Sequence, residues 1–512
     1  MIMVKNPGVH IFTFFVAVYA IFSIGHFGGD GYQDYLTAES IVLDGNLSLY
    51  DRPDDVDELG YGRDLGVEGA DGKIYSARGG LGVPVILAAF YAVGHLLSKF
   101  LSGVPHDYIT MLAVSFANPV MTALACLLIF IVAGRMGFSR KVATAIGIVY
   151  GFSTMAPVYT RTGFAEPAVI VFLLLGIKSA ISYKDDPDVK RVLMSAIFIA
   201  AMLLCKTPYV ILIPCFLIYI LWSARSSGIK TGEIVLHISV FLTVITAAII
   251  GLLFFNYLVY GNVSAFGGVD AVVIGKRIAG APHVLKGIYY YLLSTGKGFF
   301  LFNIPVIFAF FSLKKAFRDD KKGTALFLLI FVVNLLFYVK SFRRGSLFSW
   351  GPRYLLPSVP VLLLLSGYYL EGAKHIFRKV LYFAGAFAGF VMILPCMFVN
   401  QSKFYFFVVE KLRLDEYMIN FIPDLSPIKG AWAMLLSRIA LLINGEMPPY
   451  VYAPDYRLVE PAAASMEQYN YMDIWFLKVI EIAPAYAPLV YAVLSVLAAT
   501  AVFSAYKIIR TR

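Results

Sequence analysis

The side chain best placed to do chemistry is Asp30, the first acidic residue of the chain, which follows an opening apolar segment. The glycines at 28, 29 and 31 free the backbone around it. An apolar stripe predicts a short helix that would hold it: Tyr32, Leu36, Ser40 and Leu43. Because an ionisable group near the membrane surface is more often functional, we predict that Asp30 is a catalytic base. Asp34 and Glu39 on the same helix are secondary candidates.

A second acid, Glu166, lies in the tight turn that joins two apolar segments, and Arg161 belongs to the same turn. Glu166 is a candidate catalytic residue and Arg161 a secondary one. The pair Glu166-Pro167 also fits the first turn of a helix, where an acid and a proline are both favoured. The structural explanation therefore stays open beside the functional one.

Basic residues flanked by glycine, proline or aromatic residues are candidates for binding a phosphate group. Exposed N–H groups and guanidinium groups both suit phosphate oxygens. The candidates are Tyr75, Arg78, Lys297, Arg343, Arg344 and Arg353, with Trp350 as a secondary candidate. For Arg78 an interfacial arginine that merely extends to the headgroups is an equal explanation.

Composition sets the class of protein. Of 512 residues 59% are hydrophobic and 15% charged, and the mean hydropathy is +0.76, which is far from soluble averages. This predicts an all-α polytopic membrane protein. The net charge of +11 arises mainly in short loops between apolar segments, so nucleic acid is not an expected partner.

Segment length predicts a bundle of about 12 transmembrane helices, with further helices and loops beside the membrane on the outer side. The predicted spans are 8–27, 112–134, 142–160, 167–183, 190–206, 207–223, 233–256, 299–314, 323–339, 354–371, 378–400 and 484–506. The apolar stretch 83–98 is short and could lie along the interface instead of crossing it.

Lysine and arginine alternate from loop to loop, which predicts that both termini are cytoplasmic. The long segments 28–82, 257–298, 340–353 and 401–483 then lie on the outer face, together with the active site. Lys297 and the cluster 340–353 place bases on that face against this rule, which favours a functional reason for them. The expected location is the inner, cytoplasmic membrane of the cell.

Three regions follow from this organisation. Residues 1–400 are predicted to form a transmembrane catalytic module whose first outer loop is 28–82. Residues 401–483 would form a cap that lies on the outer membrane surface. Residues 484–512 would form the last transmembrane helix and a cytoplasmic tail.

Four stretches together resemble the GT-C superfamily of glycosyltransferases, which use sugars linked to polyprenyl phosphate. The first stretch runs from Asp30 to residue 47 and contains the pattern Tyr-x-x-Ala-x-Ser at 35–40. The other three are residues 75–91, 296–305 and 350–355. The protein O-mannosyl and aminoarabinose transferase branches are the most similar. In those branches an acid of the first outer loop activates the acceptor and a second acid follows in the next outer loop, positions that Asp30 and Glu166 occupy. Gly31 stands where those branches often have another acid.

The resemblance implies transfer of a sugar from a polyprenyl-phosphate donor to a lipid, glycan or protein acceptor, by an inverting displacement with Asp30 as base. One carboxylate and several cations suffice for that chemistry. The sequence predicts no metal ligands, and a divalent metal cofactor is left open. The alternative is a transporter or flippase for lipid-linked glycans, which would favour ionisable residues within the spans.

Overall fold

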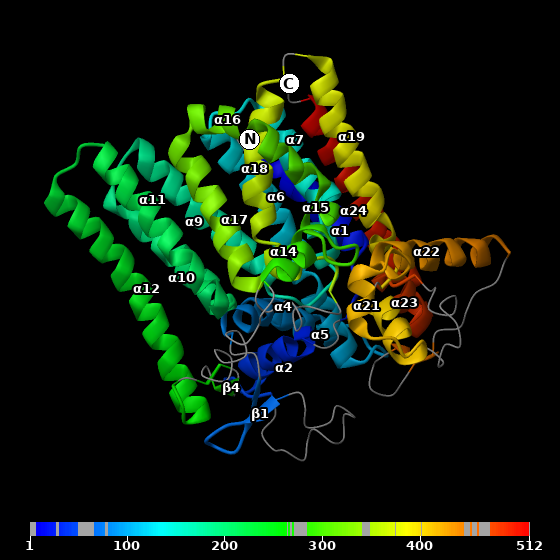
Figure 1. Cartoon of the computed structure of the whole chain (residues 1–512). Coiled ribbons are helices and arrows are strands. Elements are labelled where there is room, and N and C mark those ends of the chain that lie inside the picture. Colours follow the sequence, from blue (N-terminus) through cyan, green and yellow to red (C-terminus); the bar gives the residue numbers. More distant parts are fainter. Residues whose placement is uncertain are drawn as a thin grey trace.

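The computed structural model describes most of the chain as a bundle of helices (Figure 1). The described residues are 7–26, 30–49, 66–76, 80–263, 265–266, 269–270, 284–339, 349–373, 375–400, 402–444, 451–452, 458–459 and 472–510. Arg78, Arg343 and Arg344 lie outside them, and so does the side chain of Asp30.

Seven helical segments are long and apolar enough to cross a membrane within this described part, so the chain is a multi-pass membrane protein. They are His106–Arg135, Glu166–Asp185, Thr207–Ser226, Thr231–Tyr260, Lys321–Val339, Ile376–Met397 and Pro484–Arg510. Shorter apolar helices cover Pro7–Ile21, Gly82–Ser98 and Ser358–Glu371. The predicted count of about 12 spans is thus not confirmed, although the all-α membrane class is.

The helices of the bundle follow the chain in order. They are α1 (Pro7–Ile21), α5 (His106–Ser115), α6 (Ala117–Arg135), α7 (Arg140–Ser153), α8 (Ala156–Tyr159), α9 (Glu166–Asp185), α10 (Val189–Cys205), η3 (Thr207–Leu212), α11 (Ile213–Ser226), α12 (Thr231–Tyr260), α14 (Val284–Leu293), α15 (Phe299–Phe302), η4 (Ile304–Val306), α16 (Ile307–Asp319), α17 (Lys321–Val339), η6 (Arg353–Leu355), α18 (Ser358–Glu371), α19 (Ile376–Ile393), η7 (Leu394–Met397) and α24 (Ala487–Arg510).

The remaining elements include the three hairpins and the helices near them in the chain. The first outer loop contains α2 (Asp30–Leu43), β1 (Gly66–Glu68) and β2 (Ile74–Ser76), and α4 (Gly82–Ser98) follows it. Later come β3 (Ala265–Phe266), β4 (Val269–Asp270), α20 (Ser402–Phe406), η8 (Phe407–Lys411), α21 (Glu416–Phe421), η9 (Pro423–Leu425), α22 (Pro427–Ile443), β5 (Val451–Tyr452), β6 (Leu458–Val459), α23 (Trp475–Ile482) and η11 (Pro484–Tyr486). Each strand pair is an antiparallel hairpin.

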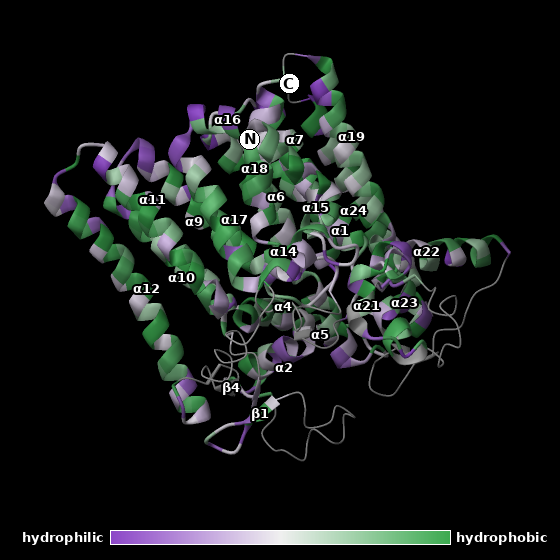
Figure 2. Ribbon diagram, in the orientation of Figure 1, coloured by the Kyte–Doolittle hydropathy of each residue, from purple (hydrophilic) through white to green (hydrophobic). Residues whose placement is uncertain are grey.

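The two ends of the described chain lie on one face of the bundle. Helices α1 and α24 pack against each other, and the hydroxyls of Thr13 and Ser504 are 2.8 Å apart. Helices α2, α4 and α5 gather at the opposite face (Figure 1). Apolar residues dominate the helices between the two faces, whereas hydrophilic residues concentrate at their ends (Figure 2). This is the distribution that a bilayer requires.

The predicted helix after Asp30 is present as α2, and it packs on α4. Gly31 lies directly against Gly163, so closely that a Cβ on Gly31 would overlap the Cα of Gly163. The first turn of α2 is therefore pressed onto the turn that precedes α9. Two positions that the sequence separates by more than 130 residues meet at one point.

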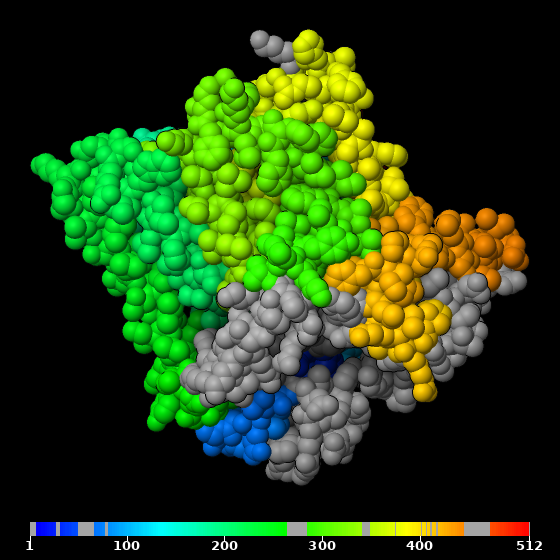
Figure 3. Space-filling model, in the orientation of Figure 1, coloured from blue at the N-terminus to red at the C-terminus, as the bar shows by residue number. Residues whose placement is uncertain are grey.

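The β1–β2 hairpin packs on the end of α12, where Figure 3 shows the hairpin in blue beside the green helix. The amide of Ala70 donates to the main-chain oxygen of Val259 over 2.7 Å. The hydroxyl of Tyr260 donates to the main-chain oxygen of Ser76 over 2.8 Å. The hairpin is thus held on α12 at its turn and at the end of β2.

Candidate active site

Glu166 is the centre of a buried cluster of charges at the face where α2 lies. Its carboxylate is fully buried, and its Oε1 forms an ion pair with the ammonium of Lys206. The same oxygen is 3.6 Å from Nε of Arg353. Its other oxygen, Oε2, has no hydrogen-bond partner among the described residues.

The turn that carries Glu166 is fixed by an amide side chain from α6. Asn118 donates from Nδ2 to the main-chain oxygens of Thr162 and Phe164, over 2.5 and 3.0 Å. Pro167 follows in the first turn of α9, where proline fits because its missing N–H would have no helical partner. Glu166 therefore does begin a helix, as the structural explanation required, and it also forms the centre of the cluster.

Arg353 lies between aromatic rings. Its guanidinium carbon is 4.1 Å from the ring centre of Phe164 and 4.9 Å from that of Tyr354. Its Nη2 donates a hydrogen bond of 3.1 Å to the Tyr354 hydroxyl. The ring of Tyr354 also receives the Lys206 ammonium at 4.8 Å. Rings that hold two cations fix the direction in which both charges point.

The main chain of Tyr354 is tied to two neighbouring elements. Asn334 of α17 donates to its carbonyl oxygen over 3.0 Å, and the Tyr209 hydroxyl of η3 donates to the same atom over 3.3 Å. The ring stacks on Tyr338 with centres 4.6 Å apart. The cluster therefore rests on rigid helices of the bundle.

Lys297 lies fully buried beside this cluster. Its ammonium donates to the main-chain oxygen of Ser349, and the hydroxyls of Ser349 and Tyr405 are each 3.4 Å away. Burial, and then the charge of Arg353, lowers the pKa of Lys297 well below its usual value.

Asp34, one turn along α2 from Asp30, joins the same electrostatic environment. It is buried, and burial raises its pKa from 3.8 to about 8; the charge of Lys206 lowers this pKa and that of Glu166 raises it. Residues four apart lie on one face of a helix, so the backbone position of Asp30 borders the same site. The predicted secondary candidate is thus close to the predicted second acid.

Other predicted residues lie elsewhere. Arg161 is buried, but its guanidinium donates to the main-chain oxygens of Cys396 and Asp473, away from Glu166. Trp350 buries its ring against Phe302, with centres 5.1 Å apart, and its main-chain oxygen accepts a hydrogen bond from the Tyr159 hydroxyl over 2.7 Å. Both support the site without entering it.

Two more candidates of the first outer loop face other groups. The Tyr91 hydroxyl donates to Glu39 Oε1 over 2.6 Å, on the side of α2 that packs on α4. Tyr75 lies on the β1–β2 hairpin and donates to Asp71 over 2.8 Å. The structure therefore does not bring Glu39 or Tyr75 to Glu166.

Sequence reasoning missed Lys206 and Tyr354. Lys206 interrupts a long apolar run two residues before Pro208, and that break was its only local signal. Tyr354 directly follows Arg353 but was not singled out. Among the described residues no group of three or more His, Cys, Asp or Glu side chains could hold a metal ion.

The cluster combines one ionised acid with more than one cation in a buried place. Glu166 faces both Lys206 and Arg353, so the group carries net positive charge. Burying charge without compensation costs several kcal/mol per ion. An anionic ligand with several oxygens would remove that cost, and a phosphate group has the matching chemistry.

Comparison with protein families gives one match. Residues 93–251 match the family model described as dolichyl-phosphate-mannose-protein mannosyltransferase. The matched range includes Arg161, Glu166 and Lys206. No curated protein sequence matches the chain.

Solved structures with a similar course of the chain include ArnT from Cupriavidus metallidurans in two crystal structures. The match with the apo structure covers 96% of this chain and 73% of the ArnT chain, at 12% identity and a TM-score of 0.45. The match with the structure bound to undecaprenyl phosphate covers 98% of this chain and 76% of the ArnT chain, at 10% identity and a TM-score of 0.46.

Proposed function

We propose that this chain, whose residues 93–251 match a mannosyltransferase family model, is a GT-C glycosyltransferase that transfers the sugar of a polyprenyl-phosphate donor at the Glu166 cluster. The observation that carries the proposal is the buried excess of positive charge around Glu166. A site of this kind favours a ligand that brings negative charge. The donor phosphate would supply it.

The cations have separate tasks in this proposal. Arg353 and Lys206 bind the phosphate oxygens and stabilise the charge that grows as the sugar leaves. Lys297 lies beside them, with its ammonium on the main-chain oxygen of Ser349. Lys206 keeps a fifth of its side chain exposed, so this part of the cluster is open to a ligand.

Asp30 acts as the base in the proposed reaction. An acceptor hydroxyl oxygen forms a bond to the anomeric carbon while the bond from that carbon to the phosphate oxygen breaks. The bonding electrons leave with the phosphate, and the hydroxyl proton passes to the Asp30 carboxylate. One displacement of this type inverts the anomeric configuration.

Glu166 is the second catalytic carboxylate of the proposal. Its Oε1 orients the two cations, whereas its unpartnered Oε2 can accept a hydrogen bond from the acceptor. Positioned donors and acceptors of this kind contribute much of the rate of a displacement. The acceptor class, whether lipid, glycan or protein, stays a prediction.

The location of the site stays part of the proposal as well. Helix α2 lies at the face opposite the two ends of the chain (Figure 1), and its Gly31 contacts Gly163 in the turn that precedes Glu166. With both termini cytoplasmic, as the loop charges predict, the site faces the outer side of the inner membrane.

The test is an assay of the purified full chain in liposomes with radiolabelled sugars on polyprenyl phosphate. We expect covalent transfer of label to an acceptor and release of polyprenyl phosphate. If the labelled lipid moved between leaflets with no product formed across the donor panel, the flippase alternative would replace the proposal.

A further inference from the structure

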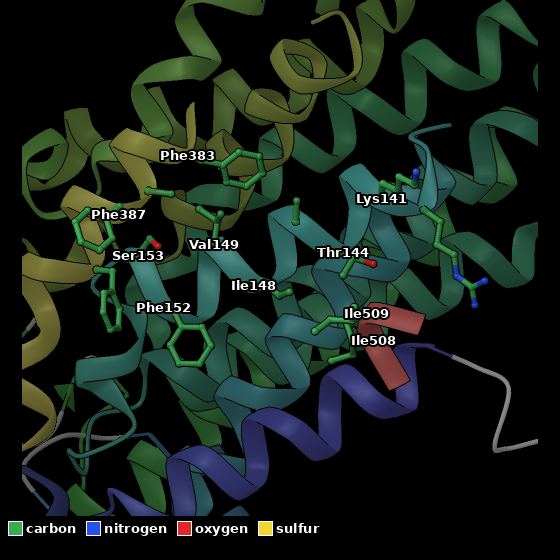
Figure 4. A pocket seen from close by; sticks show the side chains of 14 residues that line it. Lys141, Thr144, Ile148, Val149, Phe152, Ser153, Phe383, Phe387, Ile508 and Ile509 are labelled. Atoms are coloured by element: carbon green, nitrogen blue, oxygen red, sulfur yellow. The ribbon is translucent and has the colours of Figure 1, made fainter. Parts of the chain in front are cut away.

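A second site lies far from the charge cluster, in a groove on the side of the bundle. The groove has a volume of about 970 Å³ and runs between α7, α19 and α24. Figure 4 shows Phe152, Phe383 and Phe387 along it, with Lys141 at the opposite end from Phe387. None of its lining residues belongs to the Glu166 cluster.

One end of the groove opens at the face that holds the two chain ends. Arg140 and Lys141 begin α7 there, and Ile508 and Ile509 come from the last turn of α24. The groove follows α7 down to Ser153, a distance of about 20 Å at 1.5 Å per residue. This is comparable with the depth of one leaflet, half of roughly 30 Å.

The lining chemistry divides the groove into an apolar length and a basic mouth. Of the described residues that line it, Thr144 and Ser153 are the only ones with uncharged polar side chains, so water would find few partners inside. Among the described residues that line it, none is acidic. An alkyl chain suits such a surface within a bilayer.

The two basic side chains at the mouth are exposed and make no hydrogen bond or ion pair with another described residue. The start of α7 is nevertheless fixed, because the amide and hydroxyl of Ser139 donate to Glu371 over 3.0 and 2.9 Å. Arg140 and Lys141 are therefore held at the membrane surface with their charges available. A phosphate headgroup has the complementary charge.

We propose that the groove binds an anionic phospholipid of the leaflet on this face. Its phosphate contacts Arg140 and Lys141, and one acyl chain lies along Phe152 and Phe387. The site is independent of sugar transfer. It differs from the donor site in face, in lining and in the leaflet that supplies the lipid.

Native mass spectrometry of the full chain in detergent tests this with phosphatidylglycerol and phosphatidylcholine as probes. We expect the wild type to bind phosphatidylglycerol more tightly than phosphatidylcholine. The variant R140A/K141A should bind phosphatidylglycerol about 30-fold more weakly. Ala145→Trp, which fills the groove, should weaken binding of both lipids.

The matched control is R225A/K230A, which removes two exposed basic residues from the same face but outside the groove. It should leave binding unchanged. Equal affinity for the two phospholipids, or an equal loss in the control, would overturn the proposal. So would displacement of phosphatidylglycerol by equimolar polyprenyl phosphate. Thermal unfolding of each variant checks that it is folded.

Discussion

Gly31 and Gly163 are in direct backbone contact, which joins the helix of the first outer loop to the turn that carries Glu166. A Cβ on Gly31 would overlap the Cα of Gly163, so the Gly31 position leaves no room for a side chain. The contact sets the distance between the backbone at Asp30 and the Glu166 cluster. Its two glycines are therefore expected to matter for activity although neither has a reactive group.

Gly31→Ala should lower the rate of sugar transfer by about 100-fold. The added Cβ would push α2 away from the turn, and a displacement of about 1 Å can cost that much in rate. Stability should fall by only about 1–3 kcal/mol. Initial rates and thermal unfolding of the same preparation check both values. Gly251→Ala, at a helical glycine with open space around it, should behave as wild type.

Glu166→Gln should lower the transfer rate by about 10²–10⁴, the range for loss of a positioned catalytic group. Donor affinity should be retained, because the change removes a negative charge beside the phosphate site. Lys206→Met should instead weaken donor binding by at least about tenfold. Separate kcat and KM values distinguish the two variants. Full activity of Glu166→Gln, matched to the exposed control Glu233→Gln, would contradict its role.

Asp34 should make stability depend on pH. Its pKa is raised from 3.8 to about 8 in the folded chain. Between these values the folded state holds a proton that the unfolded state releases, so stability falls as pH rises, by up to about 1.4 kcal/mol per pH unit. Asp34→Asn removes the titrating carboxyl and with it this pH dependence, so the unfolding temperature should change less between pH 5 and 8. Asp44→Asn, an exposed change just past the end of α2, should keep the wild-type slope.

A buried ion pair anchors the C-terminal segment near the site. Lys478 of α23 pairs with Asp473 and donates to the main-chain oxygen of Ile24 over 2.9 Å. Burial raises the pKa of Asp473, but the charges of Lys478 and His26 outweigh it and hold that pKa below its usual range. The main-chain oxygen of Asp473 also receives Arg161 from the turn before Glu166.

Lys478→Met should therefore destabilise the chain by about 3–5 kcal/mol, because it leaves Asp473 buried without its partner. The double variant D473N/K478M should recover part of that loss. Denaturant titration in mild detergent gives the free energies. Lys429→Met breaks an exposed pair with Asp424 and should cost less than about 1 kcal/mol. A similar small loss for both lysines would contradict the structural role of the network.

Local patterns were sufficient where the chain itself carries the signal. The glycines and apolar stripe after Asp30 predicted α2, and the Glu166-Pro167 pair predicted both a helix start and a candidate acid. Arg353 was singled out because the loop charges predict an outer position for it, where a base opposes the usual charge bias.

The remaining features depend on contacts between distant segments. Arg161 looked like a site residue, yet its partner Asp473 lies 312 residues further on. Lys206 looked like a lysine at the end of a span because its partner Glu166 is 40 residues away. The predicted span 299–314 divides into α15, η4 and α16 around Pro305, since proline interrupts a helix. Span counting by apolar length cannot register such breaks.

The most direct test of the account is sugar transfer by Asp30→Asn in membranes at matched expression, with donor binding measured in the same samples. The account predicts that transfer falls by at least about 100-fold while polyprenyl-phosphate sugar still binds. The exposed control Asp44→Asn should transfer at the wild-type rate. Transfer by Asp30→Asn at the wild-type rate would contradict Asp30 as the base and move that role to Asp34 or Glu166.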